Sequence, residues 1–156
     1  MTIRRKVITL ESREPSNGRR VKAMLETDKV FAGSIPENYD RYMVPLIFEQ
    51  YAADIAQRAA SCSPSAVLET AAGSGVVTRA LAPRLSPGAS YIVTDLNQPM
   101  VDYAASRQPP DTRIKWRQAD ALALPFENAA FDLVCCQFGA MFFPTAHLPT
   151  AKQSES

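Results

Sequence analysis

The sequence predicts an α/β fold: an open parallel sheet with helices, preceded by an N-terminal helical cap. Two observations support this. Short apolar runs alternate with helical stretches through the second half of the chain, and the first run leads into a glycine-containing turn that opens a helix. Strand, helix and strand at this spacing are typical of βαβ units. The 156 residues, 46% of them apolar, suffice for one domain with a core.

The N-terminal third is expected to hold an arm and the cap. Residues 1–23 contain seven basic and two acidic residues without a strand or helix period, which predicts a flexible basic arm. Residues 24–64 are assigned to the helical cap, because apolar residues recur at helical spacing between Asp40 and Ala60. Pro45 is compatible with the first turn of that helix.

The sheet is expected within residues 65–143, and residues 144–156 are expected to form an irregular tail. The predicted strands are residues 66–70, 90–95, 113–118 and 131–138, and the predicted helices are residues 75–85 and 98–107. A fourth strand with nothing beside it would leave an open edge and expose apolar side chains, namely Leu133, Val134, Cys136 and Phe138. We therefore expect a truncated sheet that self-associates through this edge.

Composition restricts the class of protein. A net charge of +1 gives no bulk electrostatic reason to expect nucleic acid or an anionic membrane as partner. Three cysteines make no disulfide framework, and no apolar run approaches the ~20 residues of a membrane-spanning helix, so we expect a cytoplasmic protein. Cys135 and Cys136 would face opposite sides of a strand, and His147 adds no convincing ligand, so no metal site is expected.

The segment Val67 to Thr78 carries the strongest functional signal. Gly73 and Gly75 lack a Cβ and allow a ligand to approach bare backbone at the start of a helix. This pattern predicts a nucleotide or nucleoside cofactor without identifying it. Glu69, which ends the first strand, suits either a ligand ammonium group or a polar network beneath the turn, and its alternative is an exposed loop acid.

Two further acids end the next two strands. Asp95 can accept hydrogen bonds from both hydroxyls of a ribose, or it can cap the following helix together with Asn97. Asp120 can accept from an exocyclic amine such as adenine N6, beside the backbone of Ala121. The remaining residues expected at this edge are Leu96 and Met100, which either cover the adenine or simply fill the core, and Gln137 at the exit of the fourth strand.

Four segments resemble, in order and spacing, the motifs of class I S-adenosylmethionine-dependent methyltransferases: residues 69–75, 94–96, 119–121 and 131–134. The similarity is to the small-molecule group called methyltransferase type 11, which includes quinone-biosynthesis methyltransferases. Residues 31–40 also look like the N-terminal cap of that group. The resemblance implies the N-terminal portion of a Rossmann-like sheet, the cofactor S-adenosyl-L-methionine and a small-molecule methyl acceptor.

The resemblance also implies roles for individual residues. Glu69, Gly73 and Gly75 would frame the methionine part of the cofactor, Asp95 its ribose, and Asp120 with Ala121 its adenine. Gln137 and Tyr39 would lie near the methyl-donor end. Ala71 stands where the family commonly has glycine, so the turn is expected to differ slightly. No catalytic residue is assigned, because methyl transfer depends largely on in-line positioning.

Two other functions stay open. The family's sheet has seven strands and about four are expected here, so the chain could be an inactive fragment that binds a cofactor or a partner. It could also be a fragment of an NAD-dependent oxidoreductase, although the turn lacks the third glycine of that class and Glu69 would repel a pyrophosphate.

Overall fold

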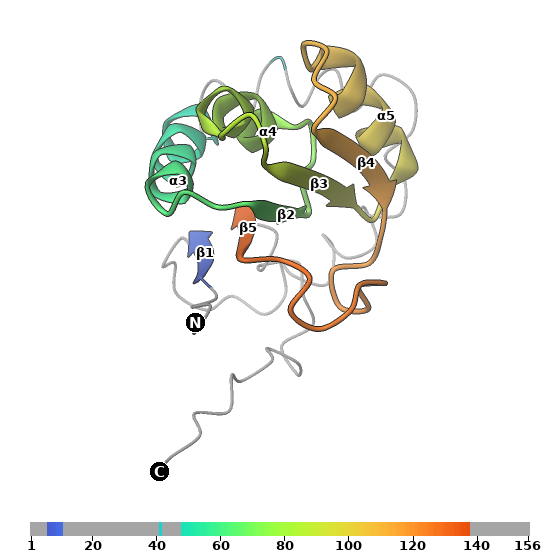
Figure 1. Ribbon diagram of the computed structural model, residues 1–156. Helices are drawn as coiled ribbons and strands as arrows, with labels where there is room; N and C mark the ends of the chain where they lie inside the picture. The colour runs from blue at the N-terminus through green and yellow to red at the C-terminus, as the bar shows by residue number, and fades with distance from the viewer. Residues whose placement is uncertain (1–5, 11–40, 42–47, 138–156) are drawn as a thin grey trace, which may run out of the picture.

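The computed structural model describes residues 6–10, 41 and 48–137. Within these residues the chain forms a five-stranded, fully parallel sheet in the order β1-β5-β2-β3-β4 (Figure 1). The strands are β1 (Lys6–Leu10), β2 (Ala66–Thr70), β3 (Ser90–Asp95), β4 (Ile114–Gln118) and β5 (Leu133–Gln137). The helices are α3 (Glu49–Ser61), α4 (Val76–Leu81), the 3-10 turn η2 (Ala82–Arg84) and α5 (Gln98–Arg107). The predicted α/β fold with an open parallel sheet is confirmed.

The N-terminal segment corrects one prediction. Lys6–Leu10, expected within a flexible arm, forms strand β1 and pairs with β5 from Lys6↔Leu133 to Leu10↔Gln137. The β-branched residues of this short apolar run favour a strand, and a strand of five residues is too short to show a clear period. The other residues of the arm, residues 24–40 of the cap and the tail at 144–156 lie outside the described residues.

Because β1 occupies one side of β5, the prediction of an open edge at β5 is wrong. Among the described strands, β1 and β4 are the outer ones. Leu133 and Cys136, expected on an exposed apolar surface, are buried, with 1% and 6% of their surface exposed. Val134 is half-buried, and Phe138 lies outside the described residues.

The core lies where α3 and α4 pack together against the sheet. Helix α3 contributes small apolar residues at helical spacing, with Ala52, Ile55, Ala56 and Ala59 all buried. The central strands are nearly continuous apolar runs because neighbouring strands and helices cover them. Burial raises the pKa of the Cys135 thiol well above its ordinary value, so this cysteine is a small, protonated core residue.

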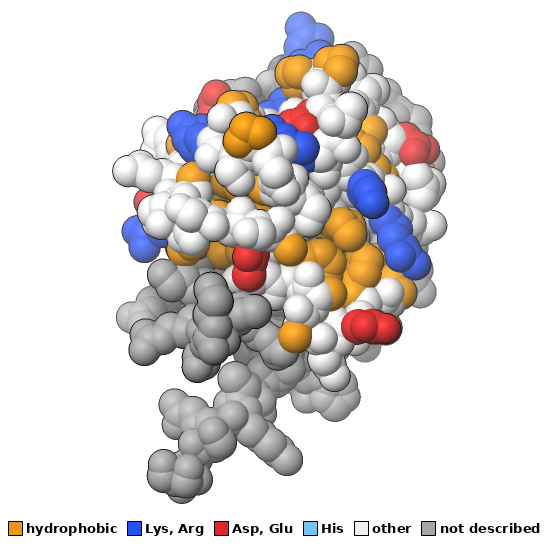
Figure 2. Space-filling model, in the orientation of Figure 1, with side chains coloured by type: hydrophobic (Ala, Val, Ile, Leu, Met, Phe, Trp, Pro, Cys, Tyr) orange, Lys and Arg blue, Asp and Glu red, His pale blue; other side chains and the backbone are white. Residues whose placement is uncertain are grey.

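The N-terminal ends of β2 and β5 are tied together by Asp132. Its carboxylate accepts hydrogen bonds from the backbone N–H groups of Ser65 at 2.8 Å and Ala66 at 3.0 Å. Asp132 therefore has a structural role at this end of the sheet. At the surface, Figure 2 shows acidic and basic side chains interspersed on one face. In the part of the chain that the structure describes, no helix has the length and apolar character that crossing a bilayer requires.

Candidate functional site

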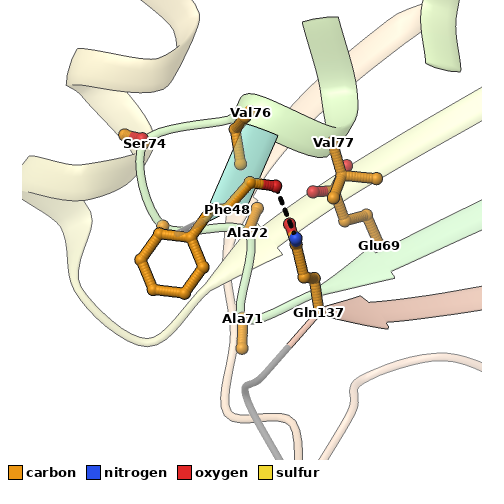
Figure 3. A pocket seen from close by; sticks show the side chains of 9 residues that line it. Phe48, Glu69, Ala71, Ala72, Ser74, Val76, Val77 and Gln137 are labelled. Atoms are coloured by element: carbon orange, nitrogen blue, oxygen red, sulfur yellow. Dashed lines mark hydrogen bonds between the residues drawn. The ribbon is translucent and has the colours of Figure 1, made fainter. Parts of the chain in front are cut away.

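A small pocket lies at the carboxyl ends of β2 and β5, beside the start of α4 (Figure 3). The residues that line it are Phe48, Glu69, Ala71, Ala72, Gly73, Ser74, Val76, Val77 and Gln137. The turn between β2 and α4 supplies four of these nine residues. Of the predicted site residues, Glu69, Gly73 and Gln137 therefore line the pocket, while Tyr39 lies outside the described residues.

The turn between β2 and α4 depends on left-handed backbone conformations. Gly73 and Gly75 have φ angles of 57° and 79°, as their residue type allows. A Cβ on Gly75 would also come within 2.9 Å of the Ala104 Cβ on α5, so glycine is required there for space as well. Ala71 adopts φ 52°, which costs about 1 kcal/mol for a residue with a Cβ. The alanine in the glycine motif thus keeps a left-handed turn at an energetic cost.

Asp95 holds this turn against the end of β3. Its Oδ2 accepts a hydrogen bond from Gly73 N at 2.8 Å, and its Oδ1 accepts one from Asn97 N at 2.9 Å. Ala72 N also donates to the Thr94 carbonyl at 3.0 Å. The expected proximity of Asp95 to the glycine turn is thereby confirmed. Each oxygen of the Asp95 carboxylate thus accepts a backbone hydrogen bond.

Asn97 occupies the N-cap position of α5, as the alternative interpretation of this segment expected, but it makes no side-chain capping hydrogen bond. The hydrogen bond from Asn97 N to the side chain of Asp95, two residues earlier, forms a local Asx-type turn. Asp95 therefore shapes the entry to α5 as well as the glycine turn.

Glu69 belongs to a buried polar network. Only 2% of the residue is exposed, and its Oε2 accepts hydrogen bonds from Thr78 Oγ1 at 2.7 Å and from the Tyr91 hydroxyl. Burial raises the pKa of Glu69 to about 7, against the opposing influence of Tyr91, Thr78 and Arg79. Of the interpretations open from the sequence, the polar network beneath the turn is the one observed, and the exposed loop acid is wrong.

Thr78 and Tyr91 were not identified from the sequence. A tyrosine inside an apolar strand needs a hydrogen-bond partner for its hydroxyl, which is a signal that could have found Tyr91. Thr78 follows Glu69 by nine residues, across the turn and into α4. Its part in the network depends on the turn geometry, which a linear pattern does not display.

Two further lining residues, Phe48 before α3 and Gln137 on β5, contact each other. Gln137, at the end of β5, donates from Nε2 to the Phe48 carbonyl at 2.9 Å, and Figure 3 shows this bond beside the glycine turn. Phe48 was not predicted, because 89 residues separate it from Gln137. This contact joins the residue before α3 to the carboxyl end of β5.

The other predicted residues continue along the same edge, outside the pocket lining. Asp120 is exposed just beyond β4, and its Oδ1 accepts from Leu122 N at 2.9 Å. Ala121, half-buried, lies in the same turn. Leu96 is 52% exposed between β3 and α5, whereas Met100 is buried, with its Cε 3.8 Å from where a Cβ on Gly73 would lie.

The carboxyl edge of the sheet therefore presents a polar group at each of four strands. They are the Gln137 amide at β5, buried Glu69 with the glycine turn at β2, Asp95 at β3 and exposed Asp120 after β4. Such an arrangement can bind an elongated ligand with several hydrogen-bonding groups at the carboxyl ends of the strands. Among the described residues, no group of three or more His, Cys, Asp and Glu side chains is placed to hold a metal ion.

Comparison with curated proteins finds demethylmenaquinone methyltransferases. The enzyme of Lactobacillus johnsonii is 35% identical over 82 residues, which cover 51% of this chain and 34% of that protein. The enzyme of Deinococcus radiodurans is 30% identical over 136 residues, covering 85% of this chain and 55% of that protein. The chain spans about a third of the length of the first curated relatives it matches.

Solved structures share the fold. A candidate methyltransferase from Bacillus halodurans aligns with a TM-score of 0.51 and 27% identity, over 58% of this chain and 39% of that one. A candidate S-adenosylmethionine-dependent methyltransferase from Methanococcus maripaludis aligns with a TM-score of 0.55 and 19% identity, over 88% and 57%, which is a likeness of fold alone. Residues 67–154 match the family described as Methyltransferase domain. The chain belongs to this family, within the class I S-adenosylmethionine-dependent methyltransferases.

Proposed function

We propose that this chain binds S-adenosylmethionine along the carboxyl ends of β2, β3 and β4 and transfers its methyl group to a small-molecule acceptor. The observation that carries the proposal is the 2.8 Å hydrogen bond from Gly73 N to Asp95 Oδ2. It brings a turn of exposed backbone and an acid at a strand end into direct contact, and a nucleoside with an attached charged group needs these two features side by side.

We assign the parts of the cofactor from the order of the strands. The methionine part lies at the pocket, against Glu69 and the turn from Gly73 to Gly75. The ribose hydroxyls lie at Asp95. The adenine lies further along the edge, between the side chains of Leu96 and Met100 and the turn formed by Asp120 and Ala121. This assignment is supported by the way these residues follow one another along neighbouring strands.

The cofactor's sulfonium supplies an already activated methyl group. The protein's contribution is to align the acceptor with that methyl group and to exclude competing water. Gln137 and Phe48 line the pocket together with the glycine turn. We place the methyl-donor end and the acceptor at these two residues, with Tyr39 nearby. No side chain is assigned as a proton acceptor.

The acceptor is a small molecule in this proposal, in a protein that acts in the cytoplasm. Apolar side chains make up much of the pocket wall, including Phe48, Val76 and Val77. Because several curated relatives are demethylmenaquinone methyltransferases, a demethylmenaquinone is the first acceptor to test.

A second candidate is a cofactor-binding protein without turnover of its own. It is supported by the described contacts at this edge, such as that of Gly73 N with Asp95, which concern the cofactor alone. In that case the cofactor contacts stay as assigned, and no methyl group is transferred.

Calorimetric titration with S-adenosylmethionine, S-adenosylhomocysteine and NAD separates these functions, followed by transfer of a labelled methyl group to demethylmenaquinone. We expect binding of the first two ligands and labelled product. Binding without transfer would favour the second candidate. NAD binding alone would point to the oxidoreductase alternative, and a folded chain that binds none of the three would contradict the proposal.

A further inference from the structure

We propose that Thr78 and Tyr91 are positioning residues that hold the Glu69 carboxyl at the pocket wall, where it distinguishes a sulfonium cofactor from its uncharged thioether product. This inference rests on the proposed function, because it assigns the methionine end of the ligand to this pocket. It adds a means of selecting the substrate form of the cofactor over the product form.

The first support is the geometry of the carboxyl. Glu69 lines the pocket beside Val77, as Figure 3 shows, while only 2% of the residue is exposed. One of its oxygens, Oε2, accepts from both the Thr78 and the Tyr91 hydroxyl. Thr78 and Tyr91 are themselves fully buried, so their hydroxyls are shielded from solvent. Two elements, α4 and β3, thus fix one oxygen of this side chain.

The second support is that the hydroxyl groups of Thr78 and Tyr91 both keep their protons. The pKa of Tyr91 is raised well above its ordinary value by burial and by the charge of Glu69, so its hydroxyl keeps its proton. A threonine hydroxyl does not ionise. Both groups therefore stabilise the ionised form of Glu69, because they can donate to a carboxylate whatever the pH.

The third support is the set of charges around the carboxyl. Arg79 on α4 lowers the pKa of Glu69 and Asp95 on β3 raises it. Cys135, the neighbour of Glu69 in the β2–β5 register, stays protonated because its own pKa is raised. Burial outweighs the stabilising groups and raises the pKa of Glu69 to about 7. A positive charge in the pocket would therefore draw the proton off Glu69 near neutral pH.

The two forms of the cofactor differ only at the sulfur atom. S-adenosylmethionine and S-adenosylhomocysteine share the nucleoside and the amino-acid group, and the former carries in addition a methyl group and a positive charge on sulfur. An ionised Glu69 attracts that charge, whereas a neutral Glu69 does not. The ratio of the two affinities should therefore rise as Glu69 ionises, and loss of the charge on transfer should favour release of the product.

The test combines a measurement without ligand and one with ligand. NMR titration of the Glu69 carboxyl, in a chain with labelled glutamate, should give a midpoint near 7 in the wild type. The midpoint should move to higher pH in Tyr91→Phe and in Thr78→Val, because each removes a donor to the carboxylate. Thr78→Ser should restore it, and Tyr51→Phe, which alters a tyrosine that is 48% exposed, is the matched control.

Calorimetry then measures the affinity for S-adenosylmethionine relative to S-adenosylhomocysteine between pH 5.5 and 7.5. We expect this ratio to rise on the order of tenfold in the wild type and to stay flat in Glu69→Gln. A ratio that does not depend on pH in the wild type, or unchanged midpoints in Tyr91→Phe and Thr78→Val, would overturn this inference while leaving the proposed function intact. Failure to bind either ligand would overturn both.

Discussion

Glu69 and Asp120 are acids at the same edge of the sheet, yet their surroundings are opposite. Glu69 lies near the end of β2, which has β5 on one side and β3 on the other, and it is buried with its pKa raised to about 7. Asp120 follows β4, an outer strand among those described, and is exposed, with its carboxylate accepting a hydrogen bond from Leu122 N. A carboxylate at a strand end is thus buried or exposed according to the position of its strand in the sheet.

The largest expected effect of this difference is on the pH dependence of stability. The folded-state pKa of Glu69 lies above the ordinary glutamate value of 4.5, so as pH rises the unfolded chain loses this proton first. The stabilisation is complete below about 4.5 and is lost by the time pH passes about 7. We expect the free energy of unfolding to fall by about 3 kcal/mol over this window relative to Glu69→Gln, measured by urea denaturation.

If the wild type and Glu69→Gln showed parallel pH profiles over this window, the prediction would be contradicted.

Asp95, on the strand between these two acids, should matter most for the ligand. Asp95→Ala is expected to weaken S-adenosylmethionine binding by roughly 1–3 kcal/mol, because charge-assisted hydrogen bonds to the ribose hydroxyls are lost. Calorimetry measures the affinity, and circular dichroism checks the fold. Unchanged affinity in a folded variant would show that the ribose lies elsewhere.

Tyr91→Phe should produce a smaller loss. The buried Glu69 carboxyl loses one of its two hydroxyl donors, which we expect to lower the free energy of unfolding by about 1 kcal/mol at pH 7. Thermal denaturation of this variant beside Tyr51→Phe measures the difference. Equal stability of the two variants would mean that the hydroxyl of Tyr91 contributes nothing to the network.

The smallest effect is expected at the outer strand. Asp120→Ala removes one exposed hydrogen bond to Leu122 N and should change the free energy of unfolding by about 0.5 kcal/mol or less. Urea denaturation provides the measurement. A loss as large as that of Glu69→Ala, which leaves two buried hydroxyls without an acceptor, would remove the distinction between the two acids.

The sequence predicted the elements that carry a strong local pattern. Strands β2 to β5 appear where the apolar runs are, and Asp95 lies against Gly73 because both end up at one edge of a parallel sheet. What could not be predicted depends on partners distant in the chain. The acceptor of the Tyr91 hydroxyl and the contact of Gln137 with Phe48 follow from packing, which leaves no periodic trace in the sequence.

Strand β1 could not be predicted for the same reason. Its single neighbour among the described strands is β5, which lies at the far end of the described chain. The registers of β2 with β3 and of β3 with β4 join segments near one another in sequence, whereas the β1 register joins residues 6–10 to residues 133–137. Closing so long a loop delays pairing, since its entropy must be lost before any contact forms. The sheet is therefore expected to assemble from β2, β3 and β4 outward, with β1 added once β5 is in place.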